Sequence, residues 1–408
     1  GWMNGDIKGA FLSDTDTTSL VGTELVTGDN STFTSGTGDW AAVDPANTTI
    51  TNPSGEMYVV STVSYEGVYL DVTTVIGSTY ALTRTVRGGT GSLRFRTYVG
   101  GASKGGISTI DNGAGSTETF THVATSTTTQ IRFQSHNTIA DFYIDDVTFK
   151  LADADRSVNA NSLAVNGTIT RTAVETGADL VGYSGFSATN NFLQPVNSDL
   201  DFGTGDFCFM SWIDTTNITA GSRYICSRDG QILFGYSSTD GGVLFTDGEA
   251  RSQKTTSGWT HLVGVRESGL LKIYTNGYQS GTSNASTRDV TSSTAQLGVG
   301  GYWTGSAWSQ TISNASLALM RISATAPSAA QIAKIYNDEK FLFQENAQAT
   351  LYGTSDAVTA LAHDDATDLL HVGTSAGRSV FQGLRRVSNT TDAITAAISA
   401  SNNLVAEE

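Results

Sequence analysis

Hydrophobic and polar residues alternate through most of the segment 21–150, which predicts strands with one wet face. The alternation is cleanest in the stretches YALTRTV and RFRTYV. Gly-rich turns separate the hydrophobic runs at intervals of about eight to twelve residues, the spacing typical of a β-sandwich. The predicted strands are Met57–Val63, Glu66–Val72, Tyr80–Val86, Ser92–Val99, Glu118–Ala124, Thr129–Ser135 and Asp141–Lys150.

A second set of strands follows in the segment 179–345. The strand Cys208–Ile213 carries Trp212, and Trp259–Val265 precedes Leu271–Tyr274. The pair Asn276-Gly277 then predicts a hairpin, because a type I′ turn needs positive φ at both central residues. We therefore predict a second sandwich, with residues 151–178 as a linker that leads into its entry strands.

The segment Ser316–Phe343 predicts a strand followed by a helix. Leu317, Leu319 and Ile322 suit a short strand, and Pro327 then ends the extended run. Ser328 and Gln331 have the spacing of a capping box, in which each side chain accepts a hydrogen bond from the other residue's backbone N–H. Ile332, Ile335, Tyr336 and Phe343 recur on one face of the predicted helix.

The two ends of the chain differ from these segments. Residues 1–20 contain one predicted strand, Ile7–Leu12, and otherwise serve as a connector. In the segment 346–408, the predicted strands Ala357–Ala362, Leu369–Thr374 and Arg378–Val387 form a meander that resembles one blade of a β-propeller. Because a single blade cannot bury its own faces, the meander needs neighbours, and Ile7–Leu12 is a candidate remnant of an adjoining blade. The predicted fold class is all-β: two tandem sandwiches and a small C-terminal meander.

The composition limits the classes of function. A chain of 408 residues exceeds one ordinary core, and its 15% of charged residues is low for a globular protein. The formal net charge of −16 argues against binding to the nucleic-acid backbone, although acidic groups can hold divalent cations. The sequence contains no run of eighteen apolar residues, so no membrane span is predicted. Cys208 and Cys226 lie in apolar surroundings, which favours buried thiols over a disulfide.

The segment 21–150 resembles the carbohydrate-binding jelly rolls that are appended to xylanases and glucanases. The resemblance rests on Glu24–Thr27, which enters a loop ending at Trp40, and on the closing strand Phe142–Val147. The family's opening phrase is scrambled here, at Gly28-Asp29-Asn30. The resemblance implies a structural calcium ion held by Asp145 with Glu24 or Asp29 as partners, since Ca²⁺ prefers oxygen ligands. The alternative interpretation is that these acids end a strand in a solvated turn.

The segment 179–345 resembles the concanavalin A-like (laminin-G-like) lectin sandwiches. The resemblance rests on four phrases in order: Gly205-Asp206-Phe207, Trp259–Val263, Tyr274–Gly277 and the strand–helix closure. The closure is similar, more narrowly, to that of bacteriophage tail and virion-fibre proteins. These phrases are specific for the fold and much less so for a ligand.

No catalytic phrase is present in the sequence, so we expect no enzymatic activity. Catalytic concanavalin A-like glucanases carry Glu-x-Asp-x-x-Glu on one strand, and this chain has no such phrase. Asp145 and Asp146 are neighbours in a strand, so they point to opposite faces and cannot form a catalytic pair. His363 and His371 flank an Asp-rich turn, which explains them without a metal.

The candidate glycan contacts are aromatic. Tyr302, Trp303 and Trp308 lie in the polar loop GGYWTGSAWSQT, and Trp40 ends a polar loop of the first sandwich. Exposed rings stack against the apolar faces of sugars, whereas the alternative is that these rings cover a sandwich edge or a subunit contact. Trp212 and Trp259 lie in or beside strands and are interpreted as core.

The combined interpretation is a non-catalytic bacteriophage virion protein of the tail or fibre, located on the particle outside the cell. Its expected partners are a glycan of the host cell surface and other virion proteins, with no nucleic acid and no membrane insertion. Repeated copies multiply weak sugar contacts, so we expect a homo-oligomer, a trimer by analogy with fibres. The alternatives are a purely structural decoration module, a polysaccharide depolymerase and a bacterial surface adhesin.

Overall fold

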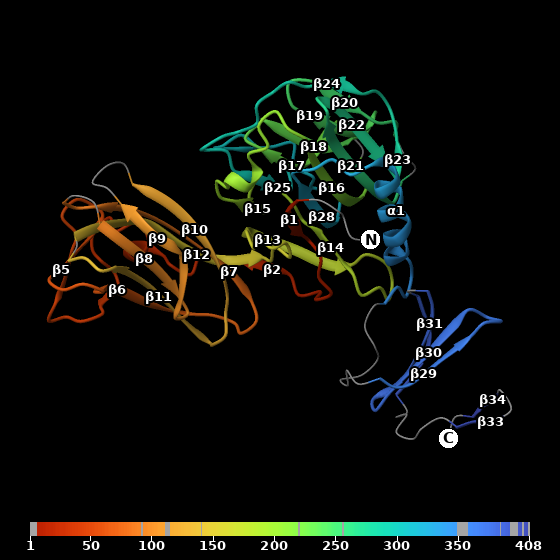
Figure 1. The fold of residues 1–408 in the computed structure, drawn as a ribbon, viewed down its shortest axis with the longest axis horizontal. Helices are drawn as coiled ribbons and strands as arrows, with labels where there is room; N and C mark the ends of the chain where they lie inside the picture. Colours follow the sequence, from red (N-terminus) through yellow and green to blue (C-terminus); the bar gives the residue numbers. More distant parts are fainter. Residues whose placement is uncertain are drawn as a thin grey trace.

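The computed structural model describes residues 6–90, 93–110, 115–139, 141–218, 221–254, 257–348, 358–383, 385–391, 399–401 and 404–406. Figure 1 shows two β-sandwiches beside each other and a small sheet near the C-terminus. Nearly all regular structure in the described part is strand, so the predicted all-β class is confirmed. No helix in the described part is long and apolar enough to cross a membrane.

The first sandwich packs two five-stranded antiparallel sheets face to face. The β12 sheet consists of β4 (Thr48–Thr51), β5 (Met57–Ser61), β12 (Asp141–Asp153), β7 (Thr79–Gly88) and β10 (Ser116–Val123). The β11 sheet consists of β3 (Ala41–Ala42), β6 (Gly67–Thr73), β11 (Thr128–Ser135), β8 (Leu93–Val99) and β9 (Ala102–Ile110). Alternate residues of both sheets, such as Leu82, Phe133 and Phe142, fill one buried core. The sequence alternation therefore predicted seven of these strands to within a few residues and missed β3, β4 and β9.

The second sandwich also consists of two antiparallel sheets. The β16 sheet contains β1 (Ile7–Phe11), β14 (Val181–Ser184), β28 (Leu317–Ser323), β16 (Phe207–Asp214), β21 (Trp259–Glu267), β22 (Leu270–Thr275), β23 (Tyr278–Gln279) and β24 (Asn284–Ala285). The β17 sheet contains β13 (Leu163–Ala173), β15 (Asn191–Gln194), β25 (Leu297–Val299), β17 (Ser222–Arg228), β18 (Ile232–Ser237), β19 (Gly241–Phe245) and β20 (Glu249–Arg251). The apolar core between them includes Phe192, Phe209 and Phe234.

The N-terminal strand belongs to this second sandwich. β1 pairs with β28, so the interpretation of Ile7–Leu12 as a remnant of a propeller blade is wrong. β2 (Leu20–Gly22) pairs with β13, which lies in the segment interpreted as a linker. The first sandwich is therefore inserted between β2 and β13 of the second. β12 joins the two, because its last residues, Ala152 and Asp153, pair with β13.

The closing helix forms as predicted. α1 (Ala329–Glu339) begins at Ser328, whose hydroxyl accepts a hydrogen bond from the Gln331 N–H while the Gln331 side chain accepts one from the Ser328 N–H. The capping box is thus confirmed. α1 covers the outer face of the β16 sheet, where Ile332 and Ile335 are buried with Cys208. A short 3-10 helix, η3 (Lys340–Phe343), follows.

Two smaller predictions are also confirmed. Asn276 and Gly277 both have positive φ, 51° and 86°, in the turn that joins β22 to β23. A side chain at Gly277 would press on Tyr336 and Ala333 of α1, so this turn also needs a residue without a Cβ. Cys208 and Cys226 are free and buried, and burial raises the pKa of both thiols.

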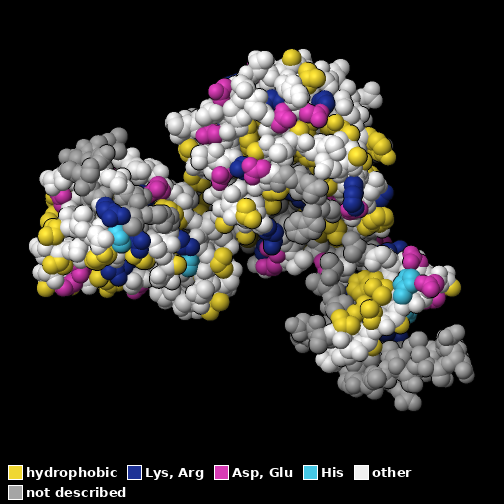
Figure 2. Space-filling model, in the orientation of Figure 1, with side chains coloured by type: hydrophobic (Ala, Val, Ile, Leu, Met, Phe, Trp, Pro, Cys, Tyr) yellow, Lys and Arg dark blue, Asp and Glu magenta, His cyan; other side chains and the backbone are white. Residues whose placement is uncertain are grey.

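The C-terminal sheet is a four-stranded meander of β29 (Val358–Asp364), β30 (Leu369–Thr374), β31 (Gly377–Gln382) and β32 (Arg385–Thr390). A meander was predicted, but the single predicted strand Arg378–Val387 is two strands, β31 and β32, with a turn that includes Gly383. Ala357, the first residue of the predicted meander, lies outside the described residues. Val372, Val380 and Phe381 are buried, whereas Val358 and Leu361 are exposed. Figure 2 shows hydrophobic side chains gathered on this part of the chain. The described residues include no second blade beside it.

Candidate functional site

Trp40 is buried, so it is not the exposed glycan contact that the sequence predicted. The ring is 5% exposed and stacks on Phe133 in the core of the first sandwich, with 5.1 Å between the ring centroids. Its indole N–H donates to the Asn30 carbonyl oxygen at 2.9 Å. The loop that ends at Trp40 therefore folds its aromatic residue into the sandwich, and a sugar cannot stack on this ring.

The three carboxylates predicted to hold calcium are each engaged with different protein groups. Glu24 Oε1 accepts hydrogen bonds from the backbone N–H groups of Val26 and Phe149 at 3.1 and 2.6 Å. Asp29 accepts hydrogen bonds from Ser35, which lower the pKa of its carboxyl group. Asp145 accepts one from the Asp146 N–H at a bulge in β12. The described residues contain no group of three His, Cys, Asp or Glu side chains that could hold a metal ion, whereas Glu24 Oε2 is buried without a hydrogen-bond partner. Calcium binding stays a prediction.

The other three predicted aromatic residues lie together on one hairpin. β26 (Tyr302–Trp303) pairs with β27 (Trp308–Ser309), and the rings of Trp303 and Trp308 lie 5.3 Å apart. The Trp303 indole donates to Gln296 Oε1 at 3.1 Å, and its backbone N–H donates to Ser227 Oγ of β17 at 2.7 Å. All three rings are half-buried, so this tryptophan hairpin presents aromatic edges to solvent.

A tight contact with β25 holds the tryptophan hairpin. A Cβ at Gly298 would lie 2.6 Å from Trp303 Cβ and 2.7 Å from the Trp308 ring. We expect Gly298→Val to displace the hairpin and to cost about 1–3 kcal/mol, the usual effect of overpacking. Tryptophan fluorescence and thermal unfolding measure this change. Ala307→Val, at the exposed tip of the same hairpin, is the control, and unchanged fluorescence in Gly298→Val would contradict the packing.

Asp229 lies beside this hairpin and was missed by the sequence reasoning. It has a φ of 40° in the tight turn between β17 and β18, where the Gln231 N–H donates to the Arg228 carbonyl oxygen at 2.7 Å. Burial raises the pKa of its carboxyl group, and Oδ1 is buried without a hydrogen-bond partner. The pair Asp229-Gly230 predicts a turn between two strands, but it does not predict a buried carboxylate beside the hairpin.

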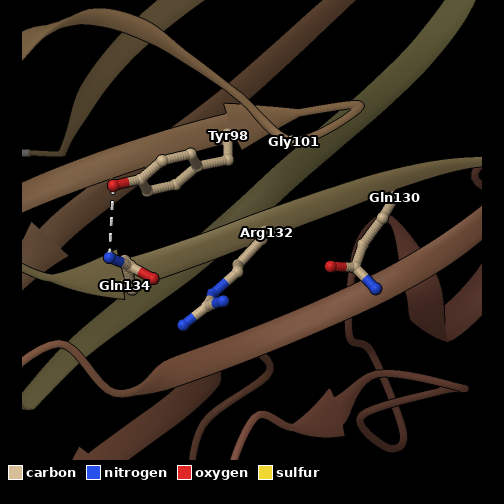
Figure 3. Close-up of a pocket in the computed structure, with 5 residues that line it drawn as sticks. All are labelled: Tyr98, Gly101, Gln130, Arg132 and Gln134. Atoms are coloured by element: carbon tan, nitrogen blue, oxygen red, sulfur yellow. Dashed lines mark hydrogen bonds between the residues drawn. The ribbon is translucent and has the colours of Figure 1, made fainter. Parts of the chain in front are cut away.

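A groove crosses the outer face of the β11 sheet (Figure 3). It has a volume of about 230 Å³ and is lined by Tyr98, Gly101, Gln130, Arg132 and Gln134. Along β11, Ile131 and Phe133 point into the core, so the alternating Gln130, Arg132 and Gln134 point outward. The Gln134 amide donates to the Tyr98 hydroxyl at 3.4 Å. The groove thus combines a tyrosine ring with planar polar groups on rigid strands.

The strand register determines which side chains meet in this groove. Arg132 lies opposite Tyr98 of β8 on one side and opposite Tyr69 of β6 on the other. Gln134 lies opposite Arg96. A row of one arginine between two tyrosines therefore crosses the sheet. Sequence reasoning predicted a wet face for these strands but did not identify the groove, because the pairing of β8 with β11 is a long-range property.

Basic groups are concentrated on this face. Figure 2 shows Lys, Arg and His side chains gathered on the visible face of the first sandwich. His136 follows β11, and its backbone N–H donates to the Arg94 carbonyl oxygen at 2.7 Å. Loss of hydration, followed by the nearby charges of Arg96 and Arg94, lowers the pKa of the His136 imidazole. The local potential is therefore positive in a chain whose net charge is strongly negative.

Comparison with known families defines the class of the second sandwich. Residues 187–333 match the Laminin_G_3 family, described as the concanavalin A-like lectin/glucanases superfamily. This match and the fold identify the second sandwich as a concanavalin A-like domain, as the sequence resemblance predicted. No curated protein matches the chain by sequence.

Solved structures show remote likeness. The binding domain of Paraclostridial Mosquitocidal Protein 1 is 12% identical, with 56% of this chain and 61% of that chain covered and a TM-score of 0.38. Domain 4 of AbnA, an extracellular arabinanase from Geobacillus stearothermophilus in complex with arabinotriose, is 17% identical (45% and 92% covered, TM-score 0.35). The binding domain of botulinum neurotoxin DC with rat synaptotagmin II is 11% identical (63% and 66% covered, TM-score 0.36). The chain spans less than two thirds of the first and third of these structures, and such TM-scores carry no functional argument.

Proposed function

We propose that this protein binds a glycan non-catalytically through the groove on the β11 sheet. The observation that carries the proposal is the row of Tyr69, Arg132 and Tyr98 beside the amides of Gln130 and Gln134. Tyrosine rings suit the apolar faces of sugar rings, and guanidinium and amide groups suit their hydroxyls. The described lining of the groove holds no carboxylate, which favours binding over hydrolysis.

The proposed setting is the tail or fibre of a bacteriophage particle, outside the cell, attached to a glycan of the host surface. The sequence resemblance of the strand–helix closure at Ser316–Phe343 supports this setting. Because a small groove gives weak binding, repeated copies in a homo-oligomer would supply avidity, and we propose a trimer in contact with other virion proteins.

A second candidate is a purely structural module of the particle. The C-terminal sheet favours it, since Val358, Leu361 and Val387 expose apolar side chains that suit contact with a neighbouring chain. In that case the groove binds no sugar, and the half-buried tryptophan hairpin lies between subunits.

The test is binding of the fluorescently labelled full chain to candidate host cells, with and without removal of their surface polysaccharide. We expect binding that disappears with the polysaccharide. The double variant Tyr98→Ala/Gln134→Ala should bind at least tenfold more weakly, whereas Thr117→Ala on the opposite sheet should bind normally. A parallel measurement in EDTA tests the calcium ion predicted at Glu24, Asp29 and Asp145, since loss of binding in EDTA would support it.

Four outcomes would contradict parts of the proposal. Binding that survives removal of the polysaccharide would favour a protein receptor, and no binding by folded, oligomeric protein would favour the structural module. Degradation of the polysaccharide during the assay would identify a depolymerase instead. Location of the native protein on a bacterial surface, and not on a virion, would favour an adhesin.

A further inference from the structure

The outer face of the β11 sheet carries three arginines that form no ion pair, and one of them, Arg132, lines the groove. Arg94, Arg96 and Arg132, the arginine cluster, form no ion pair in the part of the chain that the structure describes. Other arginines are paired: Arg84 with Glu118, Arg87 with Glu56 and Arg228 with Asp201. Since Asp and Glu number 39 against 23 Lys and Arg, acidic partners are abundant in this chain. Among the described residues none of them pairs with the arginine cluster, which leaves its positive charge for another group.

The guanidinium groups are only weakly satisfied within the protein. Arg96 donates to the Tyr98 hydroxyl and Arg132 to the Tyr65 carbonyl oxygen, each at 3.4 Å, near the outer limit of a hydrogen bond. The Nε atoms of Arg96 and Arg132 are buried and have no hydrogen-bond partner. A buried donor without a partner costs free energy, which a ligand that accepts its hydrogen bond would recover.

Arg96 and Arg132 lie on the same face of the sheet. Arg132 is opposite Tyr98, and Arg96 is opposite Gln134, so the two arginines occupy diagonal positions on neighbouring antiparallel strands, within reach of long side chains. Arg94 is two residues further along β8, on the same face. Asp71, on the edge of this face, accepts a hydrogen bond from Gln130 at 3.1 Å. The centre of the groove therefore has donors in excess.

On the basis of the proposed glycan binding, we propose that this groove selects an acidic sugar, one whose carboxylate lies against Arg96 and Arg132. The planar guanidinium fork matches the geometry of a carboxylate and binds it with two parallel hydrogen bonds. Tyr98 and Tyr69 supply the flat apolar surface for the sugar ring, and the amides of Gln130 and Gln134 take its hydroxyls.

The size of the groove favours a short acidic unit over a nucleic acid. Its volume of about 230 Å³ is below the range of about 300–1,000 Å³ typical of pockets for drug-sized ligands, so it suits one or two sugar units. Nucleic-acid binding would need a continuous basic path, which three arginines do not supply.

The test measures affinity of the full chain for polygalacturonate, alginate and hyaluronan, each beside its carboxyl-reduced, neutral counterpart. We expect at least one acidic polymer to bind at least tenfold more tightly than its neutral form. Arg132→Gln and Arg96→Gln should each weaken binding to that polymer about 10- to 100-fold and remove the preference for the acidic form. Arg156→Gln removes one charge from a half-exposed arginine that lies outside the groove. This control should change neither the affinity for the acidic polymer nor the preference for the acidic form. Unfolding midpoints confirm that the variants are folded.

The outcomes separate the inference from the proposed function. Equal binding of acidic and neutral polymers, or binding to host cells without binding to any acidic polymer, would overturn the acidic preference and leave glycan binding intact. A loss of affinity in Arg156→Gln equal to that in Arg132→Gln would indicate unspecific charge attraction and overturn the inference. Tighter binding to single-stranded DNA than to every acidic polymer would also overturn it. No binding to cells or polymers would overturn both the acidic preference and the proposed glycan binding.

Discussion

The Glu339→Ala variant is expected to lose about 3–5 kcal/mol of unfolding free energy, because it breaks a buried ion pair and leaves one charge behind. Glu339 is 4% exposed at the end of α1. One carboxylate oxygen pairs with Arg321 at 2.5 Å, and the other accepts a hydrogen bond from the Trp212 indole at 2.9 Å. The carboxylate thus joins the helix to β28 and β16. Denaturant unfolding measures the loss.

The control for this prediction lies on the same helix. Lys334 is exposed and pairs with Asp338 one turn away, so Lys334→Ala should change the stability by no more than about 0.5 kcal/mol. Glu339→Gln should fall between the two, since its amide oxygen can still accept from Trp212 but carries no charge for Arg321. If Glu339→Ala unfolds like Lys334→Ala, the helix is not held by this carboxylate.

The second large effect is a loss of stability in acid that depends on His261. This imidazole is completely buried between Trp212 and Tyr336, and neither ring nitrogen has a hydrogen-bond partner. Burial and then the charge of Arg321 lower its pKa from 6.5 to about 3. Below pH 6.5 the unfolded chain takes up a proton that the folded chain refuses, so stability falls as the pH falls. The slope is about 1.4 kcal/mol per pH unit, or about 3 kcal/mol by pH 4.

The His261→Phe variant isolates this contribution. It keeps an aromatic ring in the cluster and has no group to protonate, so the difference in stability between the two proteins should grow in favour of the variant from pH 6.5 to pH 4. The comparison is needed because buried Asp153, whose pKa is raised to about 6, acts in the opposite direction. The folded form takes up this proton at a higher pH than the unfolded chain does, so this group raises the stability as the pH falls from about 6 to 3.8. Parallel pH profiles of the two proteins would contradict the prediction.

The local elements of the fold were predictable from the sequence, whereas their long-range pairing was not. Alternation predicted seven of the ten strands of the first sandwich, and Ser328 with Gln331 predicted the start of α1, because both signals depend on neighbours in the sequence. The pairing of Ile7–Phe11 with β28 joins residues about three hundred positions apart, and no local pattern marks it. The insertion of one sandwich into the other was therefore missed.

The candidate site was only partly predictable. Tyr302, Trp303 and Trp308 come together because they are close in sequence and form one hairpin. The prediction for Trp40 was wrong because a polar loop can still fold its aromatic rings inward, where the Trp40 ring stacks on Phe133 and its indole donates to a backbone carbonyl. The groove was missed because Tyr98 and Arg132 meet only through the register of β8 on β11.

The most direct test of the central claim is a crystal structure of the full chain with a bound acidic oligosaccharide, at a concentration that saturates binding in solution. The account predicts a sugar ring beside Tyr98, with its carboxylate within hydrogen-bond distance of Arg96 or Arg132. Electron density for the sugar at the tryptophan hairpin or on the β12 sheet, with the groove on the β11 sheet free of sugar, would contradict it.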